Sequence, residues 1–279
     1  MRGHRFLFVI VLLYGTVIPG WAFAQAPGSS WGLNPAWDDG LAEVATYDAE
    51  RVVYKKTRRY EVVLITVKED FNATSHAKAD PPYEGKTLLP VLKLNGVATI
   101  QTENYPYHYL TSAFVRRDDV LRLEKLTNGS QEWCGNTFKE IRAWGERPEM
   151  LFHSYWDGEG DGSYALGWEA GDLAEDQLPL SLRGLPFRAG FRLKARMIDT
   201  QATNRAVRPK FAEADIRVAG EETVSCGIGP VDCWRVEVAR DGQTQCYWFE
   251  KAYPNILVKF ESPDGRKLLL KTRERRKYW

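Results

Sequence analysis

The sequence predicts a mainly β protein, built as a curved antiparallel sheet or open half-barrel with one short helix. Short runs rich in β-branched and aromatic residues recur from residue 43 to the end of the chain. Tight-turn sequences such as Asp241-Gly242 separate several of these runs, and only one segment carries helix signals. We therefore expect a single β-rich domain over residues 43–279, preceded by an N-terminal leader over residues 25–42.

The first residues have the pattern of a signal peptide. Arg2 and Arg5 precede an apolar run at residues 6–18, and small side chains at Ala22 and Ala24 suit cleavage before Gln25. The run is shorter than the roughly 20 apolar residues of a spanning helix. We expect residues 1–24 to be removed, which predicts a periplasmic or secreted protein with no transmembrane anchor after processing.

The N-terminal half of the domain reads as long strands. Residues 43–67 are strand-like throughout, and in residues 60–67 apolar side chains occupy both alternating faces, which indicates a strand covered on both sides. Asn95-Gly96, flanked by apolar residues, predicts a hairpin within residues 88–101. Asn128-Gly129 predicts a second tight turn.

The helix signals lie in residues 172–184, after a Gly-rich acidic segment at residues 156–171 that must be loop-rich. Asp172 and Glu175 have capping-box spacing and Gly184 is a suitable stop, while Pro179 predicts a short or broken helix. Strands are expected again at residues 191–198, 216–225, 231–239, 245–249, 256–261 and 267–272. Turns are expected at Ala219-Gly220, Asp241-Gly242 and residues 263–265.

The C-terminal third also shows a family pattern, carried by VSCGIGPVDCWRV at residues 224–236 and YWFEKAYP at residues 247–254. These blocks resemble an uncharacterised family of exported bacterial β proteins, distantly similar in architecture to the LolA/LolB lipoprotein carriers. The resemblance implies a strongly curved sheet that forms an open half-barrel around a helix, in the cell envelope. It supplies no catalytic residues, and the lipid role of the carriers is an analogy of fold alone.

Four cysteines in an exported chain favour disulfides over free thiols. If Asp241-Gly242 closes a two-residue hairpin, Cys233 and Cys246 lie roughly 13 Å apart, which is too far for a bridge. Cys226 and Cys233 flank the turn at residues 227–230 and can meet, which leaves Cys134 to pair with Cys246.

Cys134 has a second interpretation, as the nucleophile of a hydrolase with His108 or His153 as its base. No family-specific catalytic sequence surrounds it, and no hydrolase, P-loop or dinucleotide fingerprint occurs in the chain. We therefore expect no cofactor and more readily a structural cysteine than a catalytic one.

Two further ligand classes are disfavoured. The 38 basic and 37 acidic residues nearly balance, so nothing indicates nucleic acid as a partner. Residues 157–162 place acidic side chains at alternate positions, as a calcium loop does, but Trp168 stands where the bidentate glutamate is needed. We expect a solvated acidic turn and no metal.

The functional hypothesis rests on one concave face of the sheet. Tyr105, Tyr107 and Tyr109 share a strand face and are expected to rim an opening. Ile256, Val258 and Phe260 alternate with other residues and would give their strand an inner side. These six residues are the predicted ligand-binding set, around a mostly apolar pocket of roughly a few hundred Å³ for a lipophilic small molecule.

The alternative is that the predicted helix closes this pocket. Its leucines, Leu173, Leu178, Leu180 and Leu182, are numerous enough to fill a concave face. The protein would then be an envelope structural or interaction protein, with another envelope protein as its partner and no small ligand.

Overall fold

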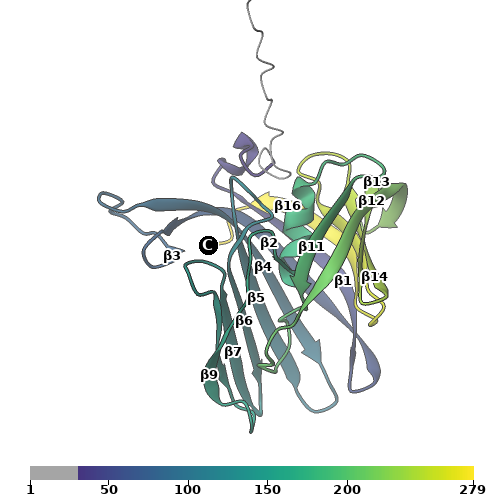
Figure 1. The fold of residues 1–279 in the computed structure, drawn as a ribbon. Helices are drawn as coiled ribbons and strands as arrows, with labels where there is room; N and C mark the ends of the chain where they lie inside the picture. The colour runs from purple at the N-terminus through teal and green to yellow at the C-terminus, as the bar shows by residue number, and fades with distance from the viewer. Residues whose placement is uncertain (1–30) are drawn as a thin grey trace, which may run out of the picture.

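Sixteen strands form one continuous, almost entirely antiparallel sheet in residues 31–279, the part of the chain that the computed structural model describes (Figure 1). The strands are β1 (Ala42–Val53), β2 (Lys56–Asn72), β3 (Ala77–Lys78), β4 (Leu88–Gln101), β5 (Pro106–Arg116), β6 (Leu123–Glu132), β7 (Gly135–Arg142), β8 (Glu149–Ser154), β9 (Asp161–Ala165), β10 (Leu173–Ala174), β11 (Arg192–Ile198), β12 (Phe211–Cys226), β13 (Gly229–Arg240), β14 (Gln243–Glu250), β15 (Leu257–Glu261) and β16 (Lys267–Arg276). Their order is β10-β11-β12-β13-β14-β15-β16-β1-β2-β4-β5-β6-β7-β8-β9, with β3 beside β2. The first and last strands of this order do not pair, so the barrel stays open and the predicted fold class is confirmed.

The concave side of the sheet holds two apolar cores. One gathers side chains of β11 to β16 and β1, and the other gathers side chains of β4 to β8. The short helical segment lies between these two halves of the sheet (Figure 1). Leu178 and Leu182 belong to the first core, whereas Leu180 belongs to the second. The helical segment therefore joins the two halves of the half-barrel.

This segment confirms the expectation of a short, broken helix. It consists of η2 (Glu175–Gln177), α1 (Leu178–Ser181) and η3 (Leu182–Gly184), with Pro179 in the first turn of α1, where a missing N–H costs nothing. The expected capping pair is not formed. Gln177 instead accepts a hydrogen bond from the Ala174 N–H at 2.9 Å, and Asp172 binds Arg196 at 2.6 Å. Residues 31–279 contain no helix with the length and apolarity needed to cross a membrane.

The turn at Asp241-Gly242 is confirmed together with its register. Asp241 and Gly242 both have positive φ, 50° and 75°, as a two-residue hairpin requires, and Cys233 lies opposite Glu250. A similar turn at Tyr54 and Lys55, with φ of 52° and 61°, divides the run at residues 43–67 into β1 and β2.

Three other predicted turns are wrong. Asn95-Gly96 lies inside β4 and Asn128-Gly129 lies inside β6. Gly96 pairs with Leu64 on one side and Thr111 on the other, so the sheet supplies backbone partners that outweigh the local turn preference. Ala219-Gly220 is likewise no turn, because it forms a bulge within β12 between Val218 and Gly220.

The predicted leader packs onto the fold from Trp31 onward. Trp31 and Trp37 are buried, and the Trp31 indole donates a hydrogen bond to Asn255 at 3.2 Å. Beneath them the Arg183 guanidinium makes two hydrogen bonds, of 2.8 and 2.7 Å, with the Glu43 carboxylate. This buried pair fixes the end of the helical segment against β1.

Candidate functional site: a cavity on the concave face

A cavity of about 160 Å³ remains on the concave face after the helical leucines are packed. Its floor is formed by β2, β4 and β5, its far wall by β14 to β16, and its cover by Pro179 and residues 200–202. The apolar lining includes Val62, Leu64, Ala98, Ile100, Tyr109 and Phe260. The space is smaller than the few hundred Å³ expected, because the helical segment fills most of the half-barrel.

The cavity exists because β4 carries two small residues at its centre. Gly96 lies between Leu64 and Thr111, and Ala98 lies between Val62 and Tyr109, all on the concave face. A Cβ placed on Gly96 would meet Leu64 Cδ2 at 3.5 Å and the Thr111 carbonyl oxygen at 3.9 Å, which are ordinary contacts. Larger residues at these positions would therefore project into the cavity without displacing backbone.

The three predicted tyrosines, Tyr105 just before β5 and Tyr107 and Tyr109 within it, form a row, and one of them reaches the cavity. Their rings form a ladder, with centroids 5.5 Å apart from Tyr105 to Tyr107 and 6.4 Å apart from Tyr107 to Tyr109. Tyr109 lines the cavity, whereas Tyr107 is buried and its hydroxyl bonds that of Tyr54. Tyr105 lies at the outer end and stacks on Trp133 at 5.8 Å. Burial raises the pKa of Tyr107 and Tyr109 above the usual tyrosine value.

The predicted inner side of the strand at residues 256–261 is altered by a bulge. The register shifts between Trp248 and Phe249, so that Phe260 pairs with Tyr247 while Leu257 pairs with Phe249. Phe260 lines the cavity, but Ile256 and Val258 are fully buried in the core that also contains Leu178 and Leu182. Strict alternation could not reveal this, because a bulge moves the following residues by one position.

Charged groups gather at one end of the cavity. Arg266 and Glu175 form an ion pair at 2.6 Å, and Glu50 binds Arg59 at 3.1 Å and Lys267 at 3.5 Å. Asp176 is partly buried and accepts hydrogen bonds from Thr200 Oγ1 at 2.6 Å and the Gln201 N–H at 2.7 Å. Its burial raises the pKa of the Asp176 carboxyl above the usual value.

A strap, residues 200–206, crosses the concave face beside this charged end. Side chains of the sheet hold its backbone, and Lys139 of β7 is the centre of these contacts. The Lys139 ammonium lies 2.6 Å from the Gln201 carbonyl, 3.1 Å from that of Thr203 and 2.9 Å from that of Arg205. Only 1% of Lys139 is exposed, and this burial lowers the pKa of its amine to about 8.

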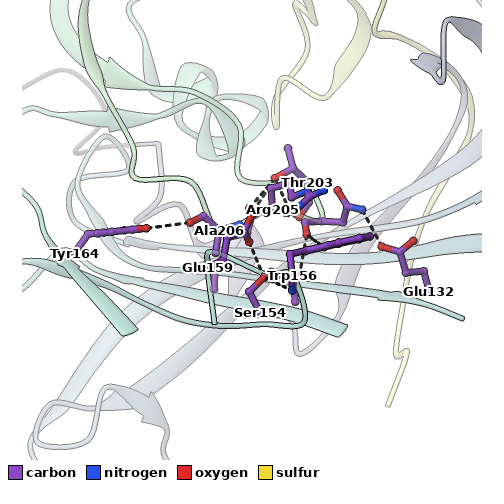
Figure 2. A network of polar contacts seen from close by, with 11 residues as sticks. Glu132, Ser154, Trp156, Glu159, Tyr164, Thr203, Arg205 and Ala206 are labelled. Atoms are coloured by element: carbon purple, nitrogen blue, oxygen red, sulfur yellow. Dashed lines mark hydrogen bonds and ion pairs between the residues drawn. The ribbon is translucent and has the colours of Figure 1, made fainter. Parts of the chain in front are cut away.

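The far end of the strap is held by the β8–β9 loop (Figure 2). The Trp156 indole donates to the Asn204 carbonyl at 2.7 Å, and Glu159 accepts from the Ala206 N–H at 2.8 Å. Ser154 also donates to Glu159, at 2.6 Å. Glu159 lies in the acidic turn considered above as a calcium loop, and its carboxylate holds the strap. No group of three or more potential metal ligands occurs among residues 31–279.

The strap and its lysine were not anticipated from the sequence, although one signal was present. In β7, Thr137, Lys139 and Ile141 occupy the buried positions of a strand in which alternate residues are more exposed. A lysine at an inner position of an alternating strand needs buried hydrogen-bond partners, because a buried charge without them is costly. The partners themselves lie more than 60 residues away in sequence.

All four cysteines are free thiols in the structure. The expected Cys226–Cys233 bridge is not formed, because the hairpin register sets Cys226 opposite Gly229 and Cys233 opposite Glu222, four positions along β12 from Cys226. The expected Cys134–Cys246 bridge is not formed either. Cys134 lies at the turn after β6, whereas Cys246 lies in β14 and is contacted by Arg235.

The alternative of a catalytic Cys134 is not supported by its surroundings. The Cys134 sulfur lies 2.9 Å from the Tyr105 hydroxyl. His108 contacts Thr99 at 3.0 Å, and His153 contacts Asp161 at 3.2 Å. Neither predicted base is hydrogen-bonded to the thiol in the described part of the chain.

Comparison with known proteins adds a family match over the C-terminal part of the chain. No curated protein and no solved structure matches, so the likeness to the LolA/LolB carriers stays a prediction. The family match runs from η2 into β16 and includes both blocks on which the resemblance rested, at residues 224–236 and 247–254. Residues 175–271 are thus similar to a family described as a protein of unknown function, DUF3108.

Proposed function

We propose that this protein is a non-enzymatic binding protein of the periplasm or extracellular space that holds the apolar part of a small lipophilic molecule in the concave cavity. The observation that carries the proposal is the cavity itself. It persists although four buried leucines fill the half-barrel around it, and its walls are predominantly aliphatic and aromatic. If the sheet were packed only for stability, larger side chains at Gly96 and Ala98 of β4 would fill this space.

The volume limits what is enclosed. An apolar cavity of about 150 Å³ in another protein stays dry and binds benzene. A cavity of about 160 Å³ therefore encloses a group of that size, such as the end of an acyl or prenyl chain. The remainder of the ligand would extend toward the charged end, where Thr200 and Ala202 are partly exposed.

The test is to fill the cavity from its floor. Ala98→Leu directs a larger side chain into the cavity, whereas Val97→Leu, one residue earlier on the same strand, enlarges a side chain on the opposite, exposed face. Native mass spectrometry of periplasmic protein should detect a co-purifying lipophile in the wild type and in Val97→Leu, and none in Ala98→Leu.

Thermal melting with 1-octanol provides the second readout. A ligand at about 100 times its Kd stabilises the folded state by about 2.7 kcal/mol, which raises Tm by roughly 5–10 °C for a chain of this size. The rise should be absent in Ala98→Leu. If wild type shows neither a co-purifying molecule nor a rise, and Ala98→Leu simply melts higher, the cavity is a packing defect and the protein is an envelope scaffold.

A further inference from the structure

One cation at the cavity, Arg51 of β1, has no acidic partner. Its Nη1 donates one hydrogen bond, to the Ala202 carbonyl at 2.8 Å, and its guanidinium lies 5.6 Å from the centre of the Tyr109 ring. Within residues 31–279, no carboxylate oxygen lies within ion-pair distance of it. A guanidinium carries five N–H donors, so most of its binding capacity is unused by the protein.

Most other charged side chains of the cavity wall form ion pairs, and Asp176 is held by neutral donors. Glu50 is bound to Arg59 and Lys267, and Glu175 is bound to Arg266. Asp176 has both carboxylate oxygens engaged by the strap. Among the basic side chains that line the cavity in residues 31–279, Arg51 is therefore the one without a carboxylate partner.

Two further cations, Arg58 and Lys139, lie near Arg51. Arg51 lies opposite Arg58 in the β1–β2 pair, and the Arg51 charge contributes to lowering the pKa of the buried Lys139 amine. Arg58 differs from Arg51, because Glu103 binds it at 2.5 Å. A partly buried arginine with unused N–H donors beside an apolar cavity is suited to binding an anion.

We propose that Arg51 binds the anionic head group, a carboxylate or a phosphate, of an amphiphile whose apolar end occupies the cavity. This inference rests on the proposed function and specifies its ligand class. The guanidinium can bind either anion by donating two parallel hydrogen bonds, and it lies beside the Tyr109 ring at the cavity wall.

The test compares four probes with the same eight-carbon chain: octanoate, octyl phosphate, 1-octanol and octylamine. Their Kd values are measured by titration calorimetry at one ionic strength on wild type, Arg51→Met, Arg51→Lys and the matched control Arg58→Met. Wild type should bind octanoate or octyl phosphate at least about tenfold more tightly than 1-octanol, and octylamine most weakly. The stronger of the two anions identifies the head group.

The preference for the anionic probes over 1-octanol should disappear in Arg51→Met and persist in Arg58→Met. It should be reduced in Arg51→Lys, which keeps the charge but lacks the paired donors of a guanidinium. Because Arg51 also contacts the strap, melting of each variant without probe checks that it is folded. Equal affinity for octanoate, octyl phosphate and 1-octanol in wild type overturns the inference and leaves the proposed function standing. A preference for anions that survives in Arg51→Met also overturns it. Failure of every probe, 1-octanol included, refutes the proposed function and this inference together.

Discussion

The buried Lys139 provides the most demanding test of the structure, because its ammonium depends on backbone oxygens of a segment far away in sequence. In the folded protein, burial lowers the pKa of this amine from the ordinary value of 10.5 to about 8. In the unfolded chain, the Lys139 amine has its ordinary pKa of 10.5 and stays protonated up to about that pH. Between about pH 8 and 10.5 the unfolded state therefore binds more protons than the folded state, and the free energy of unfolding rises with pH.

The size of this rise in the free energy of unfolding follows from the shift in the Lys139 pKa. Each pKa unit corresponds to about 1.36 kcal/mol, so the contribution of Lys139 should grow by about 3 kcal/mol from pH 7.5 to 10.5. Lys139→Met has no amine and should lack the rise. Taking the difference between wild type and Lys139→Met removes the titration of other groups that both proteins share.

The assay is urea denaturation of both proteins at several pH values, followed by tryptophan fluorescence. Wild type should gain about 3 kcal/mol relative to Lys139→Met over this interval. A difference that stays flat would mean that the folded amine keeps its ordinary pKa and that the burial argument is wrong. Limited trypsin digestion at the exposed Arg205 gives a separate readout. Cleavage should be faster in Lys139→Met, since three strap carbonyls lose the hydrogen bond from the Lys139 ammonium.

Three further predictions concern other parts of the molecule. Arg183→Met leaves the buried Glu43 carboxylate unpaired and should lower the free energy of unfolding by about 3–5 kcal/mol in urea, and an unchanged midpoint would contradict this. Thiol counting in denaturant should find four reactive cysteines, and in the native protein Cys134 should react first, because burial raises the pKa of Cys233 to about 12. Two missing thiols would instead support the disulfide prediction. Intact mass of exported protein should lack residues 1–24, a site outside the described residues, and a full-length mass would reject the signal peptide.

The sequence predicts the local features of the fold well. Asp241-Gly242 adopts the positive φ angles that a two-residue hairpin demands, and these residues tolerate them at little cost. Pro179 limits the helix to a few residues for a local reason as well, because proline has no backbone N–H to donate within a helix. The same reasoning fails at Asn95-Gly96, because those residues are paired with a strand on each side and the turn preference is weaker than two backbone ladders.

The site was less predictable. Of the six residues predicted to bind a ligand, Tyr109 and Phe260 line the cavity, because alternation along a strand fixes the face of each residue. Ile256 and Val258 are buried with Phe260 in the same core but do not line the cavity, and the strand carries a bulge opposite Trp248. Nothing in the local sequence marks that bulge.

The sequence alone thus determined the secondary structure class, the principal hairpin and the face on which most strand residues lie, because these depend on neighbours in the chain. Only the tertiary structure decided that Gly96 and Ala98 leave a cavity, that Lys139 is buried under the strap and that Arg51 has no acidic partner within residues 31–279. Each of these depends on contacts between segments far apart in sequence. Volume and charge balance are properties of the assembled side chains, so they become defined only when the sheet curves around the helical segment.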